Sequence, residues 1–422
     1  MIIKGLLIKQ QRIMQQMTQE DLAYGICSVS YLSKIEHESI KPSDEIYDLL
    51  GKRLGLELSS LNDTFDNVIY ERLHSWHDSI KRKDFTTMKD IYQSVTESLR
   101  YNFHIDLNNL YMIFEFRYAF TLNILSNPQE TLIILHNMAE TSNLEFKYYY
   151  HKILGIYHLS EHELDKALDE LKLAKATIID LPIDDSELYY HIALVYSKLG
   201  NFAESIIYAQ KALDMYQTTL NYTKVIECCM LIAINYNLLH VYEIAEEYFH
   251  KILHSANGYL TNVIKARVYH NLGYICINNN QYSEASDYLE TALALKEQEN
   301  INATNTLYLL ALHSKSQDEL AKAKEFSEMG YIMATKYDDK KYMYKHMMLL
   351  NQIEGTHTEE AFIQLLTEEI IPYFDQVNET AERSDALKLL GAIHFDNKKY
   401  KLAAQYFKIA SQNNFKGKGV IV

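Results

Sequence analysis

Residues 271–298 read NLGYICINNNQYSEASDYLETALALKEQ, and small side chains recur in this stretch at fixed distances. Gly273 and Ala285 are 12 residues apart, and Ala292 follows 7 residues later. Such spacing places small residues on each of two consecutive helices where they cross, so that the two backbones can approach closely. Tyr282 begins the second helix and is expected to fill the hairpin. The stretch therefore predicts two antiparallel helices packed as a hairpin.

The same pattern recurs along the chain, which indicates a repeat protein. Clear copies are found at Gly155/Ala167/Ala174, Ala193/Phe202/Ala212, Ala233/Tyr242/Ala245 and Gly391/Tyr400/Ala403/Ala410. Weaker copies lie around Trp76/Phe85, Ala119, Ala311/Ala323 and Leu349/Ala361, which gives nine hairpins. Hairpins of this kind are typical of tetratricopeptide repeats, whose period is about 34 residues. The successive copies from residue 155 onward are 38 to 42 residues apart, so each hairpin is expected to carry an extra helical turn.

Composition agrees with an all-α fold. The 422 residues include only 4 Pro and 13 Gly, and almost no strand is expected. We expect residues 71–422 to stack the hairpins into a right-handed superhelix, whose concave groove is lined by the first helix of each hairpin. Grooves of this kind bind extended peptides.

Cysteine usage and charge limit the classes of function. The 4 Cys lack the spacing of a metal finger and are expected to be reduced thiols. No stretch reaches the roughly 18 apolar residues of a membrane helix, so a cytoplasmic protein is expected. The net charge of -15 argues against a protein that coats nucleic acid without sequence preference.

Residues 4–58 contain four short helical patterns with start and stop signals. Thr18 is expected to cap the second helix, because its hydroxyl can accept a backbone N–H, and Gly25 is expected to end that helix. Ser28 is expected to cap a third helix that runs to about His37. A fourth helix is expected between Pro42-Ser43 and Gly55.

The third helix has a small, polar outer face. Leu32 and Ile35 are expected to point inward, whereas the opposite side chains suit a helix laid in the major groove of DNA. The candidate DNA-binding residues are Gln19, Ser28, Val29, Ser30, Tyr31, Ser33 and Lys34.

The strings TQEDLA at 18–23 and SYLSKIE at 30–36 resemble the lambda-repressor-like (XRE) helix-turn-helix family over residues 4–58. This resemblance implies that Gln19 contacts a phosphate or a base, and that Val29 and Ser30 read bases. The alternative is a small helical bundle used only for dimer contacts. With little local basicity, modest affinity is expected from one such unit, so that a dimer on two half-sites would be needed.

Polar residues at the inward positions of the first helices are candidates for the groove. An Asn amide can pair with a peptide backbone, and Arg can hold a carboxylate with two hydrogen bonds. The candidate peptide-binding residues are Arg117, Tyr190, Asn235, Asn237, Arg267, His270, Asn271, Asn305 and Tyr308. Each of them could instead be an ordinary solvated position.

The sequence offers no site for catalysis or for a cofactor. His158 and His162 match an H-x-x-E-H metalloprotease pattern. The repeat pattern, however, predicts that His158 is buried and that His162 lies in the hairpin turn, so the two would not bind one metal ion together. We therefore expect no metal site. No phosphate-binding loop or nucleophile elbow is present, and the chain is not expected to be an enzyme.

A helix-turn-helix followed by nine tetratricopeptide-like hairpins resembles the peptide-pheromone receptors of Gram-positive bacteria, the Rap, Rgg, NprR, PlcR and PrgX family, with the domain order of NprR. This resemblance implies a quorum-sensing transcription regulator that binds operator DNA and a short re-imported peptide. Residues 59–70 are the expected hinge between the two parts.

Two other functions stay open. The repeats could hold a response-regulator protein, as the Rap resemblance implies. Alternatively, the chain could be a constitutive regulator whose repeats serve only to form dimers. In each case a homodimer or a higher oligomer is expected.

Overall fold

The computed structural model describes residues 4–15, 17–37, 39–56, 64–100, 102–255, 260–377 and 379–412. These residues form helices joined by turns, and none of them lies in a strand, as predicted. Two compact units divide the chain, Met1–Asp184 and Asp185–Val422. The main division of the chain therefore falls well beyond the expected hinge at 59–70.

Only part of the expected hinge lies in the described residues. Residues 59–63 lie outside the described residues. Asp66 caps helix α5 by accepting hydrogen bonds from the N–H groups of Val68 and Ile69, so Asn67–Tyr70 belongs to a helix and not to a linker.

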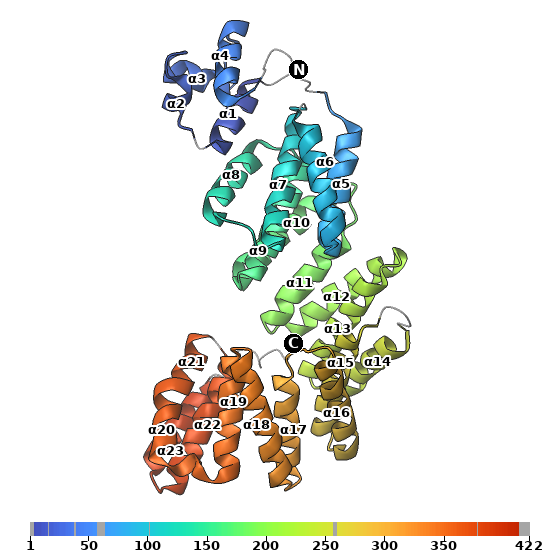
Figure 1. Ribbon diagram of the computed structural model, residues 1–422, viewed down its shortest axis with the longest axis vertical. Coiled ribbons are helices and arrows are strands. Elements are labelled where there is room, and N and C mark those ends of the chain that lie inside the picture. Colours follow the sequence, from blue (N-terminus) through green and yellow to red (C-terminus); the bar gives the residue numbers. More distant parts are fainter. Residues whose placement is uncertain are drawn as a thin grey trace. The chain divides into compact units, whose positions relative to one another are not determined.

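Four short helices form the N-terminal head of the first unit (Figure 1). They are α1 (Lys4–Met14), α2 (Gln19–Ala23), α3 (Val29–Glu36) and α4 (Asp44–Leu54). Their core contains Ile8, Leu22, Leu32, Ile35 and Leu50, all fully or almost fully buried. The predicted caps are confirmed: the Thr18 hydroxyl accepts from Asp21 N–H, the Ser28 hydroxyl accepts from Tyr31 N–H, and Gly25 has a left-handed φ of 70°.

Three hairpins complete the first unit. They are α5 (Asn67–Arg82) with α6 (Phe85–Leu99), α7 (Ile105–Thr121) with α8 (Pro128–Thr141), and α9 (Leu144–Ser160) with α10 (Leu164–Thr177), followed by the 3₁₀ turn η1 (Ile178–Asp180). Trp76 of α5 is fully buried and lies against the rings of Tyr92, Tyr111 and Tyr118.

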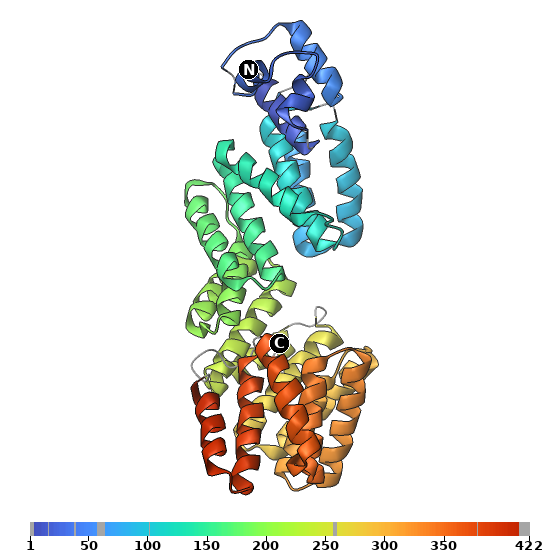
Figure 2. The ribbon, with the colours of Figure 1, turned by 90° about the vertical axis from the view of Figure 1, so that its left-hand side faces the viewer.

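The second unit contains six hairpins in the described residues, so that the predicted total of nine is confirmed. Their helices are α11 (Ser186–Lys198), α12 (Phe202–Thr218), α13 (Tyr222–Leu238), α14 (Tyr242–Ser255), α15 (Asn262–Asn278), α16 (Tyr282–Gln298), α17 (Thr304–Ser316), α18 (Leu320–Lys336), α19 (Lys340–Glu354), α20 (Glu360–Leu365), α21 (Ile371–Gln376), α22 (Thr380–Asp396) and α23 (Tyr400–Gln412). Successive helices pack side by side, as α17, α18 and α19 do in Figures 1 and 2.

The second helix of the eighth hairpin is interrupted. Between α20 and α21 the backbone forms a π-helical segment, Leu366–Ile370, directly before Ile371-Pro372. Proline has no N–H to donate and its ring crowds the carbonyl four residues earlier, so a wider turn accommodates it within the helix.

The glycines of the repeat pattern lie where two helices touch, as predicted. A Cβ added at Gly273 would lie 2.6 Å from Leu289 Cγ, and one at Gly155 would lie 2.7 Å from Leu171 Cγ. Ala285 and Ala292 are fully buried. Tyr282 does not fill its hairpin: its side chain is 38% exposed and its hydroxyl donates to Asn280 Oδ1 at the turn. The small residues, rather than this tyrosine, set the helix spacing.

Each of the nine hairpin turns in the described residues contains one residue with positive φ. These residues are Lys83, Asn123, His162, Gly200, His240, Asn280, Asp318, Gly355 and Lys398. Only two are glycines, so the turn geometry gives little signal in the sequence.

Candidate functional site

Helix α3 presents an open face at its N-terminal end. Val29, Ser30 and Lys34 are exposed, whereas Leu32 and Ile35 on the other side of the helix are fully buried in the core of the head. Because Ser28 caps the helix with its side chain, its hydroxyl is occupied by Tyr31 N–H at 3.2 Å. The exposed face therefore consists of one short apolar, one hydroxyl and one cationic side chain.

Gln19, Tyr31 and Ser33 are partly exposed beside this face. The Gln19 amide is hydrogen-bonded within the head, because Nε2 donates to Glu36 Oε2 at 2.7 Å. His37 Nδ1 lies 2.7 Å from the backbone carbonyl oxygen of Ser33. Six of the seven predicted DNA-binding residues therefore lie in α3 or at its N-cap, and Gln19 of α2 is held against the end of α3 by Glu36.

A buried ion pair connects α1 with α3, and sequence reasoning missed it. Arg12 Nε lies 2.6 Å from Glu36 Oε1, and Arg12 Nη2 lies 3.0 Å from Oε2. The Glu36 side chain is fully buried, and Arg12 also donates to the Met17 carbonyl. The Arg12 side chain is only 12% exposed, and through Glu36 it connects the last turn of α1 to the end of α3.

The predicted groove residue Asn235 lies inside the second unit. It is fully buried, and Nδ2 donates to Ser205 Oγ at 2.9 Å and to the Leu231 carbonyl at 2.8 Å. Oδ1 accepts from Ser197 Oγ at 2.8 Å. The amide joins α11, α12 and α13 to one another, so it is not free for a peptide backbone, contrary to the expectation.

Four more of the predicted residues are buried. Asn237 and Asn271 are 3% and 5% exposed, and Asn271 Nδ2 donates to the Arg267 carbonyl. His270 is 3% exposed, with Nδ1 3.0 Å from Thr306 Oγ1. In the first unit, Arg117 is buried with Nη1 2.9 Å from His77 Nε2. All four side chains are buried, so they do not line an open surface.

The other four candidates, Tyr190, Arg267, Asn305 and Tyr308, are exposed or partly exposed. They belong to α11, α15 and α17, which are first helices of their hairpins. Together with Glu227 of α13, Lys341 and Lys345 of α19 and Glu382 of α22, they form what we call the first-helix surface of the second unit.

Contacts between hairpins connect this surface. Lys224 Nζ lies 5.2 Å from the ring centre of Tyr190 and 2.7 Å from Glu227 Oε2. Lys345 Nζ lies 4.5 Å from the ring centre of Tyr308. Burial, together with the nearby Glu227 carboxylate, raises the pKa of the Tyr190 hydroxyl, which therefore stays protonated and can donate a hydrogen bond.

Two lysines share carboxylates at one end of the first-helix surface. Lys341 Nζ lies 2.9 Å from Glu379 Oε1 and 3.0 Å from Glu382 Oε1, and Lys345 Nζ lies 3.4 Å from the same Glu382 oxygen. Although burial alone would raise it, the pKa of Glu382 is lowered by these two ammonium groups, so the carboxylate stays charged. Sequence reasoning missed this cluster because charged residues in an acidic repeat array resemble ordinary surface positions.

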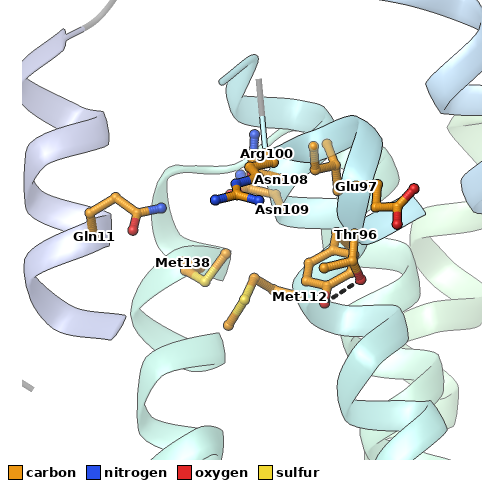
Figure 3. Close-up of a pocket in the computed structure, with 10 residues that line it drawn as sticks. Gln11, Thr96, Glu97, Arg100, Asn108, Asn109, Met112 and Met138 are labelled. Carbon is orange, nitrogen blue, oxygen red and sulfur yellow. Dashed lines mark hydrogen bonds between the residues drawn. The ribbon is translucent and has the colours of Figure 1, made fainter. Parts of the chain in front are cut away.

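A cavity lies where the head meets the first hairpins, within the first unit (Figure 3). Its volume is about 340 Å³. Gln11 of α1 faces it from the head, and Arg100, Asn109, Met112 and Met138 come from the hairpins. Asn109 Nδ2 donates to Ser142 Oγ at 2.9 Å, so part of its polar wall is already hydrogen-bonded.

No cluster of three metal-binding side chains occurs in the described residues. His162 adopts φ of 61° in the turn between α9 and α10, and His158 Nδ1 lies 2.6 Å from Glu163 Oε2. One histidine of the H-x-x-E-H pattern therefore lies in a turn, and the other is hydrogen-bonded to Glu163. Within the described ranges, none of the helices has the length and apolar character to cross a membrane.

Both parts of the chain are similar to known protein families. Residues 8–61 match the helix-turn-helix family model, and residues 186–219 and 266–299 match the tetratricopeptide repeat model. The transcriptional activator NprA of Geobacillus stearothermophilus is 26% identical over 93% of this chain and 98% of its own length. The chain resembles the NprR and Rap regulators along most of its length.

Other relatives and solved structures agree. Response regulator aspartate phosphatase I of Bacillus subtilis is 24% identical over 80% of this chain and 90% of its own. The apo quorum sensor NprR from B. thuringiensis covers 82% of this chain and 99% of its own, with a TM-score of 0.73 and 22% identity. A complex of NprR with its cognate peptide NprX covers 82% and 98%, with a TM-score of 0.61 and 21% identity. These structures support the same helical fold over about four fifths of the chain.

Proposed function

We propose that this protein is a cytoplasmic quorum-sensing transcription regulator, which binds operator DNA through α3 and a short signalling peptide on the first-helix surface. The observation that carries the proposal is the exposed N-terminal face of α3 on a chain that resembles the transcriptional activator NprA over 93% of its length. In this proposal Val29 and Ser30 read base edges, and Lys34 approaches a phosphate.

Peptide binding is supported by the partly exposed side chains of the second unit. Tyr190 and Tyr308 offer aromatic faces and hydroxyls, Asn305 offers an amide, and Arg267 is exposed. Donors, acceptors and aromatic faces in one row suit an extended peptide, which exposes its backbone groups at regular intervals. The complex of NprR with NprX supports a peptide as the class of ligand.

The test of the DNA-binding half is selection from a random pool of short duplexes by the full chain, followed by measurement of affinity for the selected duplex. A Lys34→Glu variant should lose affinity for every duplex, because it replaces a phosphate contact by a repulsive charge. A Lys52→Glu variant carries the same charge change on α4 and should keep most of the affinity. Failure to select any duplex would contradict the proposal.

Calorimetric titration with peptides of five to eight residues tests the second half. The expected result is binding tighter than about 100 µM by at least one peptide, together with a change in DNA affinity when that peptide is present. Selected duplexes with two-fold symmetry would support a homodimer, because the symmetry of an operator mirrors that of the protein.

An adaptor function is the second candidate, favoured by the similarity to response regulator aspartate phosphatase I. In that case the repeats would hold a response-regulator protein. Co-purification of a response regulator with the Lys34→Glu variant, released by peptide, would support it. A third possibility, a constitutive dimeric regulator, predicts equal operator affinity with and without any peptide.

A further inference from the structure

Two cations of the second unit lack a carboxylate partner. Lys296 of α16 is only 6% exposed, and its ammonium group donates to the neutral Asn305 Oδ1 at 2.6 Å. Arg267 of α15 is exposed. Within the part of the chain that the structure describes, neither side chain has a carboxylate oxygen within 4.0 Å. A buried ammonium held only by an amide is an unusual arrangement, because burying a charge without a counter-charge costs free energy.

The two cations act on each other. Burial and, after it, the charge of Arg267 lower the pKa of Lys296 to about 8, so the ammonium is still largely protonated at neutral pH. Arg267 also acts electrostatically on the Tyr190 hydroxyl. Positive charge is therefore concentrated between Tyr190 and Asn305 of the first-helix surface.

Three neighbouring lysines have carboxylate partners, unlike this pair. Lys224 has Glu227 at 2.7 Å, and Lys341 and Lys345 share Glu382. The whole chain carries a net charge of -15, so carboxylates are plentiful. Their absence beside Arg267 and Lys296 leaves room for an anion from outside the chain.

His270 adds a polar group without adding charge. It is 3% exposed, its Nδ1 lies 3.0 Å from Thr306 Oγ1, and its Nε2 has no hydrogen-bond partner. Burial, with the nearby Lys296 charge, lowers the pKa of His270 to about 3, so the ring is neutral at physiological pH. An unsatisfied buried ring nitrogen near the Lys296 charge is typical of an incomplete polar site.

We propose that Arg267, Lys296 and Asn305 form a carboxylate subsite, which binds an anionic group of the signalling peptide, either its C-terminal carboxylate or an Asp or Glu side chain. This inference rests on the proposed peptide-binding function and specifies the chemistry of the ligand. Arg267 would hold the carboxylate through its planar guanidinium, which matches two oxygens at once, and Lys296 would add a second charge-assisted hydrogen bond. Asn305 holds the ammonium group in place.

The experiment uses three matched pools of hexapeptides on the full-length protein. All pools keep a free amino terminus and the same randomised uncharged positions. The first pool ends in a carboxylate, the second is C-terminally amidated and contains one Asp or Glu, and the third is amidated and has no acidic group. Peptides retained by the protein after gel filtration are counted by mass spectrometry, so the first two pools distinguish the two sources of carboxylate.

At least one acidic pool should be retained about tenfold more than the neutral pool, because a hydrogen bond between charged groups has this magnitude. Arg267→Gln and Lys296→Met should each reduce that preference toward one. Lys265→Gln, with the same loss of charge on the same helix, should leave it unchanged. Thermal melting followed by circular dichroism checks that the variants are folded.

Equal retention of the acidic and neutral pools by the wild-type protein would overturn the subsite while leaving peptide binding intact. A preference that survives in both Arg267→Gln and Lys296→Met would also overturn it. Retention of none of the three pools would contradict peptide binding itself, and with it the subsite.

Discussion

Arg12 and Glu36 form a two-point ion pair in the interior of the head, with Arg12 Nε 2.6 Å from Glu36 Oε1 and Arg12 Nη2 3.0 Å from Oε2. Gln19 donates to the same carboxylate. The first residue of α2, the last residue of α3 and the last turn of α1 are therefore connected through one buried group. The orientation of α3 in the head depends on this cluster.

Replacing Arg12 by Met should destabilise the head by about 3 kcal/mol, because the Glu36 carboxylate would stay buried without its counter-charge. Hydrogen exchange of the α1 and α3 amides should speed up accordingly, and DNA affinity should fall. The double variant Arg12→Met, Glu36→Met removes both charges and should regain much of the lost protection. If the double variant were as unprotected as Arg12→Met, the burial of an unpaired charge could not be the cause.

Gly273→Ala should destabilise the second unit by about 1 to 3 kcal/mol, the usual cost of overpacking. The added Cβ would lie 2.6 Å from Leu289 Cγ, so α15 and α16 would have to move apart. Urea unfolding measures the change. In a Leu289→Ala background the same substitution should cost much less, because the clash partner is gone. An equal cost in both backgrounds would refute the close approach.

The buried ring of His346 predicts a loss of stability in acid. Burial lowers the pKa of His346 to about 4, and Nε2 lies 3.1 Å from the Thr304 carbonyl. Since the folded pKa lies below the unfolded value of 6.5, the unfolded state binds the proton first, and stability falls as pH drops from 6.5 toward 4. The contribution is on the order of 3 kcal/mol.

Unfolding curves measured between pH 7 and pH 4 test this contribution. His346→Gln keeps a donor for the Thr304 carbonyl but cannot titrate, so its stability should depend less steeply on pH than that of the wild type. Parallel pH profiles for the two proteins would show that His346 does not contribute.

Lys296→Met should stabilise the peptide-free protein by on the order of 2 kcal/mol at pH 7, because it removes a buried ammonium that has no carboxylate partner. The folded pKa of about 8 lies below the unfolded value of 10.5. Between these values the folded state has lost its proton while the unfolded state keeps it, so the stability of the wild type rises with pH.

The stability advantage of Lys296→Met should therefore shrink as pH rises from 8 to 10.5. Thermal melting of the two proteins in parallel measures this difference, and other titrating groups cancel in the comparison. A destabilised Lys296→Met variant would contradict a net cost of burying this ammonium group.

The helical repeat could be derived from the chain itself. Gly155, Gly273 and Gly391 are the points where only a hydrogen fits between paired helices, so their spacing fixed the hairpins and their phase. Thr18, Gly25 and Ser28 act on backbone groups a few residues away, so the helix boundaries of the head could also be predicted from the sequence. These signals are local in sequence, which explains why periodicity and capping rules recovered them.

The tertiary structure alone decided which polar residues are open to a ligand. Asn235 and Arg267 both occur on first helices, yet Asn235 binds the neighbouring helices and Arg267 stays exposed. Lys296 lies in the last turn of α16 and meets Asn305 at the start of α17, nine residues later, where one hairpin joins the next. Helix periodicity gives the face on which a side chain lies, but the partner of that face is supplied by another helix, which for Asn235 comes from the preceding hairpin. Exposure and charge pairing on the first-helix surface, and with them the candidate ligand site, therefore follow from the packing of the repeats.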